Sequence, residues 1–198
     1  AATLGDGWCC WLRNSGTGDI TLDPNGAELI DGLASYIMYP GEVRLVQCDG
    51  AALTSVVITP FIKEFSLSAN FVRPPGYRAF DMQAWGAGGG GGGAGASTSG
   101  GGGGGGGFAQ RTVMSSEIAA TIAITVGAGG AGGVGAATSS GNNGTVGGST
   151  VIASVLTVTG GSLGSMASPG GTYMGLSTDP YIGAPSLNTS STNGVAGT

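Results

Sequence analysis

Short apolar runs alternate with turn-forming residues along the first 75 residues of the chain. The runs are rich in β-branched and aromatic residues and occupy residues 8–12, 19–22, 36–39, 42–47, 53–58 and 61–67. Asp23-Pro24-Asn25-Gly26, Pro40-Gly41 and Asp49-Gly50 supply turn residues between them. Strand and turn signals recur about every ten residues, a spacing that predicts a small all-β, sandwich-like module.

From residue 76 onward, predicted strands run directly into glycine tracts. The strands cover residues 77–85, 108–120 and 151–158, and the longest tracts are 86–96, 100–107 and 127–133. Apolar and small polar residues alternate over 118–126, with Ile122 and Ile124 on one side, which is the period of a half-buried strand. No segment shows the 3.6-residue period of a helix, so the whole chain is predicted to be all-β.

Glycine tracts of this kind have two possible structures. They are either flexible linkers or ordered polyproline-II-like strands that rise about 3.1 Å per residue. The ordered form has no internal hydrogen bonds, so its N–H and C=O groups must bond to neighbouring tracts. Several tracts of similar length, separated by strands, favour a bundle of polyglycine-II-like strands over a linker, and we predict such a bundle.

Pro74-Pro75-Gly76 marks the predicted joint between the two regions. The expected domains are an N-terminal β-module over 1–75, a glycine-rich domain over 76–171, and a Ser/Thr/Gly-rich segment over 172–198 that is either a linker or the start of a further domain. The first residues read as strand material entering a turn, so we expect the chain to begin inside a longer polypeptide.

Composition excludes several classes of function. Only six of 198 residues are basic and the formal net charge is −5, which disfavours nucleic acid as a partner. No apolar run is long enough for a membrane helix, so no membrane insertion is expected. Histidine is absent, which removes imidazole bases and metal ligands. We therefore predict no catalytic residue, no bound metal and no cofactor.

Three cysteines, Cys9, Cys10 and Cys48, do not form a disulfide framework or a zinc knuckle. We interpret them as small buried apolar residues in strands, with a bridge from Cys48 to Cys9 or Cys10 left open.

Acidic residues in the N-terminal module offer the remaining candidate chemistry. A carboxylate pair for glycoside cleavage is conceivable, as is a calcium site within 19–31, although the spacing is not that of a known calcium loop. Most of these side chains lie in or beside turns, where they are expected to cap backbone N–H groups. The residues are Asp19, Asp23, Glu28, Asp31, Glu42 and Asp49.

Loops at the ends of the glycine tracts are the candidate binding site, because binding residues concentrate on loops held by a rigid scaffold. The same loops can equally be solvated turns. The contact candidates are Ser97, Thr98, Ser99, Thr138, Ser139, Asn142, Asn143, Ser165, Met166 and Tyr173.

Three segments resemble the glycine-rich domain of bacteriophage tail fibre and tail-tip proteins. They are Trp85-Gly86-Ala87-Gly88-Gly89-Gly90, Val126-Gly127-Ala128-Gly129-Gly130 and Gly141-Asn142-Asn143-Gly144, and the likeness extends over about 77–171. The N-terminal module is similar to another recurrent phage virion segment, through Ile20-Thr21-Leu22-Asp23-Pro24-Asn25-Gly26, Pro40-Gly41-Glu42 and Cys48-Asp49-Gly50 among others. Cys9-Cys10 departs from that pattern.

The resemblance implies a non-enzymatic virion component of the tail fibre or receptor-binding apparatus, assembled in the bacterial host cytoplasm. Implied partners are two further copies in a homotrimer, other tail or baseplate proteins, and a host surface polysaccharide or outer-membrane protein. Two alternatives are an ice- or surface-binding glycine-rich protein and the non-catalytic part of a polysaccharide-degrading tail spike. The first should carry regular Gly-x-x triplets and threonine on one face, and the sequence is interpreted as lacking both.

Overall fold

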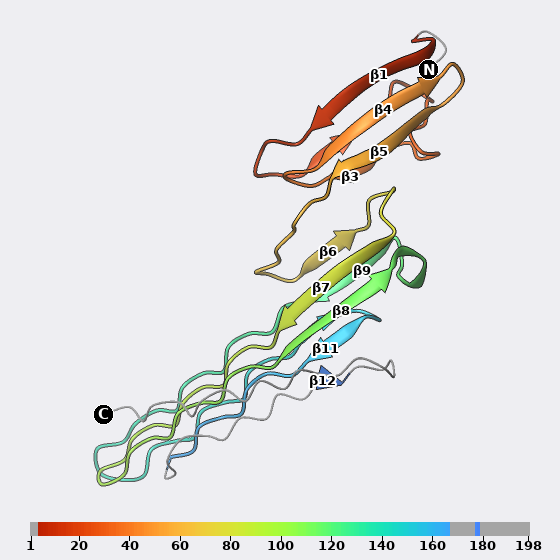
Figure 1. Cartoon of the computed structure of the whole chain (residues 1–198). Coiled ribbons are helices and arrows are strands. Elements are labelled where there is room, and N and C mark those ends of the chain that lie inside the picture. Colours follow the sequence, from red (N-terminus) through yellow and green to blue (C-terminus); the bar gives the residue numbers. More distant parts are fainter. Residues whose placement is uncertain (1–3, 167–176, 179–198) are drawn as a thin grey trace. The chain divides into compact units, whose positions relative to one another are not determined.

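The computed structural model describes residues 4–166 and 177–178 (Figure 1). Regular structure in these residues is β-strand apart from one short 3-10 helix, η1 (Ser115–Glu117), which confirms the all-β prediction. The chain forms two compact units. The first comprises Ala1–Glu64, Val72–Arg78 and Ala119–Thr121, and the second Phe65–Phe71, Ala79–Ile118 and Ile122–Thr198.

Two small antiparallel sheets build the first unit. One sheet has the order β1-β4-β5 and the other pairs β2 with β3. Its core lies on one face of β4, where alternation turns Arg44, Val46 and Cys48 inward among Met38 and Leu53. The strands are β1 (Asp6–Arg13), β2 (Ile20–Leu22), β3 (Tyr36–Met38), β4 (Val43–Asp49) and β5 (Leu53–Thr59).

The remaining strands form an antiparallel pair, β7–β8, and a sheet of order β12-β11-β10-β9-β6. Phe80 and Ala84 of β7 and Val113 of β8 are buried, and β7 and β8 contact β10 and β11 respectively. The pair therefore packs as a second layer. The strands are β6 (Ala69–Val72), β7 (Ala79–Trp85), β8 (Phe108–Met114), β9 (Thr121–Thr125), β10 (Thr150–Ile152), β11 (Leu156–Val158) and β12 (Ser177–Thr178).

Five glycine-rich tracts extend from the ends of these strands. Figure 1 shows them as wavy lines that leave β7, β8 and β9 and end in loops at the lower left. We number them tract 1 (residues 86–96), tract 2 (100–107), tract 3 (127–136), tract 4 (141–149) and tract 5 (159–165).

Hydrogen bonds between the tracts repeat every third residue. Gly86, Gly89 and Gly92 of tract 1 donate to Gly107, Gly104 and Gly101 of tract 2, each at 2.8 Å. Tract 1 also forms hydrogen bonds with tracts 3, 4 and 5. Among its neighbours, tract 2 bonds to tract 5, tract 5 to tract 4, and tract 4 to tract 3. A three-residue period with bonds only between tracts is the pattern of polyglycine II, as predicted.

Most tract glycines cannot be replaced by another residue because neighbouring backbones approach too closely for a side chain. A Cβ on Gly90, Gly103 or Gly144 would lie under 3.0 Å from a carbonyl oxygen of Ala131, Gly89 or Gly90 respectively. Ordering glycine costs more backbone entropy than ordering any other residue, so this close mutual contact is what makes the bundle stable.

Regular glycine triplets occur in tracts 3 and 4, so the interpretation that the sequence lacks them is wrong. Gly127, Gly130 and Gly133 are all crowded, as are Gly141, Gly144 and Gly147. In tract 3 the period is also visible in the sequence, because Ala128, Ala131 and Val134 recur every third residue between the glycines. In contrast, a Cβ on Gly129 would meet nothing within 4 Å, so crowding follows one face of the tract.

Two predicted strands differ from the structure. Residues 61–67 form no strand, and the next strand along the chain, β6, begins only at Ala69. The centre of the Phe61 ring instead lies 4.6 Å from that of Tyr39 and 5.2 Å from that of Tyr77. Residues 151–158 form not one strand but the pair β10–β11, which reverses at Ser154 with a φ of +59°. That turn contains neither glycine nor proline, so it lacks the residues by which turns are recognised in a sequence.

Smaller differences concern β8, the cysteines and the domain joint. β8 ends at Met114 rather than continuing to residue 120, because η1 follows it. All three cysteines are free thiols; Cys48 is buried, Cys10 is partly buried and Cys9 is exposed, so the expectation that all are buried is confirmed for Cys48 and wrong for Cys9. Residues 65–71 belong to the second unit and 72–78 to the first, whereas the sequence predicts one joint near Gly76.

Candidate functional site

Tracts 1 and 2 are joined by a tight loop that carries Ser97, Thr98 and Ser99. The Gly95 N–H donates to the Thr98 carbonyl at 2.9 Å, and the Thr98 N–H donates back to the Gly95 carbonyl at 3.4 Å. All three loop side chains are exposed. Backbone bonds thus fix the loop and leave its hydroxyl groups open to solvent.

The loop between tracts 3 and 4 lies beside the first one. The Ala96 N–H donates to the Ser139 carbonyl at 3.1 Å, and the Gly93 N–H donates to the Asn142 carbonyl at 2.8 Å. Thr138, Ser139 and Asn142 are exposed. A Cβ on Gly95 would lie 2.7 Å from the Ser139 carbonyl oxygen, so glycine at this position permits the close approach of the two loops.

The end of tract 5 adds the third group of candidates. The Gly101 N–H donates to the Ser165 carbonyl at 2.8 Å, and the Met166 N–H donates to Asn143 Oδ1 at 2.9 Å. Ser165 is half-buried, whereas Met166 and Asn143 are exposed. Asn143 therefore holds the end of tract 5 against tract 4.

The structure thus brings every described candidate residue to one end of the bundle, which we call the tip: residues 97–99, 138–139, 142–143 and 165–166. Tyr173 lies outside the described residues. Two further residues were not among the predicted contact residues: Ala96, the last residue of tract 1, and Ser140 of the second loop. Only the hydrogen bond from the Ala96 N–H reveals the role of Ala96. Apart from Met166, the tip side chains offer hydroxyl and amide groups, and none of them carries a charge.

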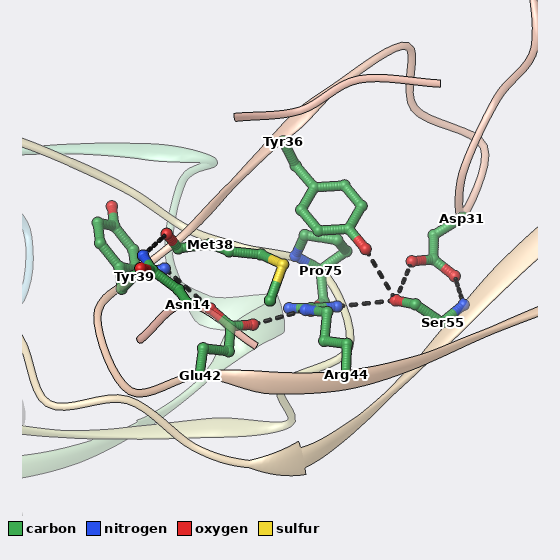
Figure 2. A network of polar contacts seen from close by, with 9 residues as sticks. All are labelled: Asn14, Asp31, Tyr36, Met38, Tyr39, Glu42, Arg44, Ser55 and Pro75. Atoms are coloured by element: carbon green, nitrogen blue, oxygen red, sulfur yellow. Dashed lines mark hydrogen bonds and ion pairs between the residues drawn. The ribbon is translucent and has the colours of Figure 1, made fainter. Parts of the chain in front are cut away.

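A second polar cluster, the Arg44 cluster, is buried in the first unit (Figure 2). The Glu42 and Arg44 side chains have no exposed surface, and Arg44 Nε lies 2.6 Å from Glu42 Oε1. Arg44 also donates to Ser55 Oγ at 2.9 Å and to the Pro75 carbonyl at 2.7 Å. One guanidinium therefore bonds to a carboxylate, a hydroxyl and a backbone carbonyl.

Neighbouring groups complete the Arg44 cluster. Ser55 Oγ donates to Asp31 Oδ2 at 2.6 Å and accepts from the Tyr36 hydroxyl at 3.0 Å, while the Tyr39 N–H donates to Glu42 Oε2 at 3.1 Å. The Arg44 guanidinium also lies 4.7 Å from the centre of the Tyr36 ring. These groups all bond to protein, and Tyr36, Glu42 and Arg44 are buried while Asp31 and Ser55 are partly buried. The cluster is therefore suited to holding the unit together rather than to binding a substrate.

The other candidate carboxylates occupy separate places. Asp19 forms an ion pair with Lys63 at 2.6 Å, and Asp49 caps the β4–β5 turn by accepting from the N–H groups of Ala52 and Ala51 at 2.7 and 2.9 Å. The hydrogen bond from the Ala52 N–H, and to a smaller extent that from the Ala51 N–H, holds the pKa of Asp49 below its ordinary value. Among the described residues, no group of three metal-ligating side chains comes together.

Burial shifts several other pKa values in the first unit. It raises the pKa of Tyr36, Tyr39 and Tyr77 above the ordinary value for tyrosine, and the effect is largest at Tyr77. Burial, with a smaller contribution from Cys9, also raises the pKa of the Cys10 thiol. Cys10 is therefore less reactive as a nucleophile than an ordinary cysteine at neutral pH.

In the part of the chain that the structure describes, no helix has the length and apolar character to cross a membrane.

Comparison with known proteins gives one family. No curated protein and no solved structure matches the chain significantly. The sequence model of the glycine-rich domain family matches residues 66–198, two thirds of the chain and all five tracts. The chain therefore belongs to the glycine-rich domain family.

Proposed function

We propose that this chain is a non-enzymatic structural protein of a bacteriophage virion, located in the tail fibre or receptor-binding apparatus. In this role the glycine bundle is a rigid platform, and the tip contacts the host surface. The N-terminal unit attaches the platform to other tail or baseplate proteins or acts as a spacer.

The observation that carries the proposal is the continuous hydrogen bonding of the tracts up to their loops. Tract 1 donates at Gly86, Gly89 and Gly92 to tract 2 and at Gly90 and Gly93 to tract 4. The bonding continues to Ala96, one residue before the loop. A platform bonded over its full length presents its loops with little loss of entropy on binding, which favours recognition.

Tip chemistry supports a surface saccharide or a polar loop of an outer-membrane protein as the partner. Ser97, Thr98, Asn142 and Asn143 supply donors and acceptors, and Met166 supplies an apolar contact that is 38% exposed. The tracts carry no charged residue, so contact with the host would depend little on salt.

Cell binding tests the adhesive role. The labelled full chain is incubated with a panel of bacterial strains, beside a variant in which Ser97, Thr98 and Ser99 are all replaced by alanine. Binding to at least one strain is expected, with affinity about tenfold or more lower for the triple variant. Ala128→Ser, an exposed change near the other end of tract 3, is the matched control and should bind normally. Equal binding by both variants would exclude the tip as the contact surface.

Two further measurements test the virion role. Antibody labelling of phage particles in electron micrographs should place the chain on the tail, and light scattering of the intact protein should give the mass of a homotrimer. Label confined to other parts of the particle would refute the location, and a monomeric mass would refute the trimer.

Glycine triplets in tracts 3 and 4 favour a second candidate, an ice- or surface-binding protein. Gly127, Gly130 and Gly133 leave Ala128 and Ala131 at regular three-residue spacing, and both are exposed. Thermal hysteresis, a difference between the melting and freezing temperatures of ice crystals in the presence of the chain, would support this function. The absence of thermal hysteresis would exclude ice binding.

A further inference from the structure

The β7–β8 pair has one buried and one exposed face. Phe80, Ala84 and Val113 lie on the buried face, and Arg111 on the same side donates to the Val155 carbonyl at 2.7 Å. Alternation along the two strands turns the intervening side chains to the opposite side. We call this opposite side the hairpin face, and it contains the cross-strand pairs Ala79–Met114, Asp81–Thr112, Gln83–Gln110 and Trp85–Phe108.

An aromatic pair ends the hairpin face where the glycine tracts begin. Trp85 and Phe108 are cross-strand partners with ring centres 5.0 Å apart, and Trp85 is 62% exposed. The next residues, Gly86 and Gly107, carry no side chains that could cover the rings. The Trp85 ring therefore stays largely in water, where its apolar faces suit it to contact a partner.

Polar pairs follow the aromatic pair along both strands. Gln83 lies opposite Gln110, and Asp81 lies opposite Thr112. Gln110 Nε2 donates to Asp81 Oδ2 at 2.8 Å and Thr112 Oγ1 donates to Asp81 Oδ1 at 3.3 Å, so the carboxylate is held in place. Successive pairs on the face are roughly 7 Å apart, which is the distance of two residues along a strand.

We propose that the hairpin face binds an uncharged saccharide chain. The apolar C–H face of one sugar ring would stack on Trp85, and hydroxyl groups of this and the next sugar would bond to Gln83, Gln110 and Asp81. Amides offer both donors and acceptors, and the carboxylate offers acceptors, which matches the mixed hydrogen bonding of hydroxyl groups.

Charge and polarity on the face decide between partners. Its single charged group, Asp81, is negative, so an anionic polymer is repelled. A purely apolar partner would remove Asp81 and Gln83 from water without offering them hydrogen bonds. The proposal concerns a surface separate from the tip and does not rest on the virion role.

Binding of the full chain to immobilised neutral oligosaccharides tests the proposal. The probes are gluco-, galacto-, manno- and N-acetylglucosamine oligomers, with sulfated dextran as the anionic comparison. At least one neutral probe is expected to bind, and Trp85→Ala should weaken that binding about tenfold or more. Trp11→Ala is the matched control, because Trp11 is a 65% exposed tryptophan of the first unit.

A second variant keeps the test independent of folding. Gln83→Ala removes one exposed amide and should weaken binding while leaving thermal unfolding unchanged. Preference for sulfated dextran, absence of binding to every neutral probe, or equal binding by wild type and Trp85→Ala would each overturn the proposal. A concentration-dependent mass that Trp85→Ala abolishes, without saccharide binding, would show instead that the face contacts another copy of the chain.

Discussion

Each of the two units of this chain is stabilised internally by a different part of the polypeptide. In the first unit, side chains provide the buried polar contacts: Arg44 bonds to Glu42, Ser55 and the Pro75 carbonyl. In the glycine bundle, the backbone provides them: tract residues donate and accept every third position, and most glycines have no room for a Cβ. Both arrangements satisfy buried polar groups, but only the first depends on charge.

This difference predicts opposite sensitivities. Removing a side chain should damage the first unit, whereas adding one should damage the bundle. A change of pH should act on the first unit, since residues 86–107, 127–149 and 159–166 contain no ionisable side chain.

Breaking the buried ion pair should have the largest effect. Arg44→Met leaves the Glu42 carboxylate buried without its cation, which costs about 3–5 kcal/mol of the free energy of unfolding. Tryptophan fluorescence in a Trp85→Phe background reports the first unit, because Trp8 and Trp11 both belong to it. Lys63→Met, which removes the partly exposed pair with Asp19, is the control and should cost about 1 kcal/mol or less. Equal losses in the two variants would contradict the structural role of the Arg44 cluster.

Adding one methyl group to tract 3 should come next. A Cβ on Gly130 would lie under 3.0 Å from the Thr145 carbonyl oxygen, so Gly130→Ala should destabilise the bundle by about 1–3 kcal/mol through overpacking. Differential scanning calorimetry would measure the shift of the bundle transition.

The adjacent position gives the matched control for this substitution. A Cβ on Gly129 would meet nothing within 4 Å, and Gly129 has no positive φ, so Gly129→Ala should stabilise the bundle by about 0.4–1 kcal/mol by restricting the unfolded chain. Similar destabilisation by both substitutions would mean that the tracts are not packed in this register.

Alkaline pH should separate the units. Burial raises the pKa of Tyr36, Tyr39 and Tyr77 in the folded state, so unfolding allows these groups to ionise earlier. Their contribution to stability is fully present below about pH 10, the ordinary pKa of tyrosine, and is lost as pH rises further. Denaturant titrations above and below this pH should show a loss confined to the first unit. An equal loss in the bundle transition would contradict the backbone account.

The smallest effect is expected at the β4–β5 turn. Asp49 has a lowered pKa because it accepts from the Ala52 and Ala51 N–H groups, so its contribution is present at neutral pH and is lost as pH falls through its folded-state pKa. Asp49→Asn keeps an acceptor oxygen and should reduce the acid sensitivity of the first unit with little change at neutral pH. If the variant were as sensitive to acid as the wild type, the acid sensitivity of the first unit would have to come from groups other than Asp49.

Much of the bundle could be predicted from sequence because its physics is local and repetitive. In glycine tracts without charged side chains, the backbone N–H and C=O groups can form hydrogen bonds with few partners other than neighbouring tracts. Ile122 is buried on β9, as the alternation over 118–126 predicted. The triplets in tract 3 are visible in the sequence as well, because Ala128, Ala131 and Val134 recur every third residue between the glycines. Recognising them requires reading the tract with a period of three.

The Arg44 cluster could have been inferred only in part. Glu42 and Arg44 are two residues apart in the predicted strand 42–47 and so are expected to share a face, which is a visible sign of pairing. Nothing in the sequence indicates that Ser55, Asp31 and the Pro75 carbonyl converge on them, because those contacts span up to 31 residues. The meeting of the tip loops likewise depends on the order in which the tracts pack.

Amide hydrogen exchange on tract 2 tests the central claim most directly. Resolved by NMR, the amides of Gly101, Gly104 and Gly107 should exchange slowly, because they donate to the carbonyls of Ser165, Ser162 and Thr159 at 2.8–3.0 Å. Exchange of these three amides at random-coil rates would contradict the bonded bundle and the platform built on it.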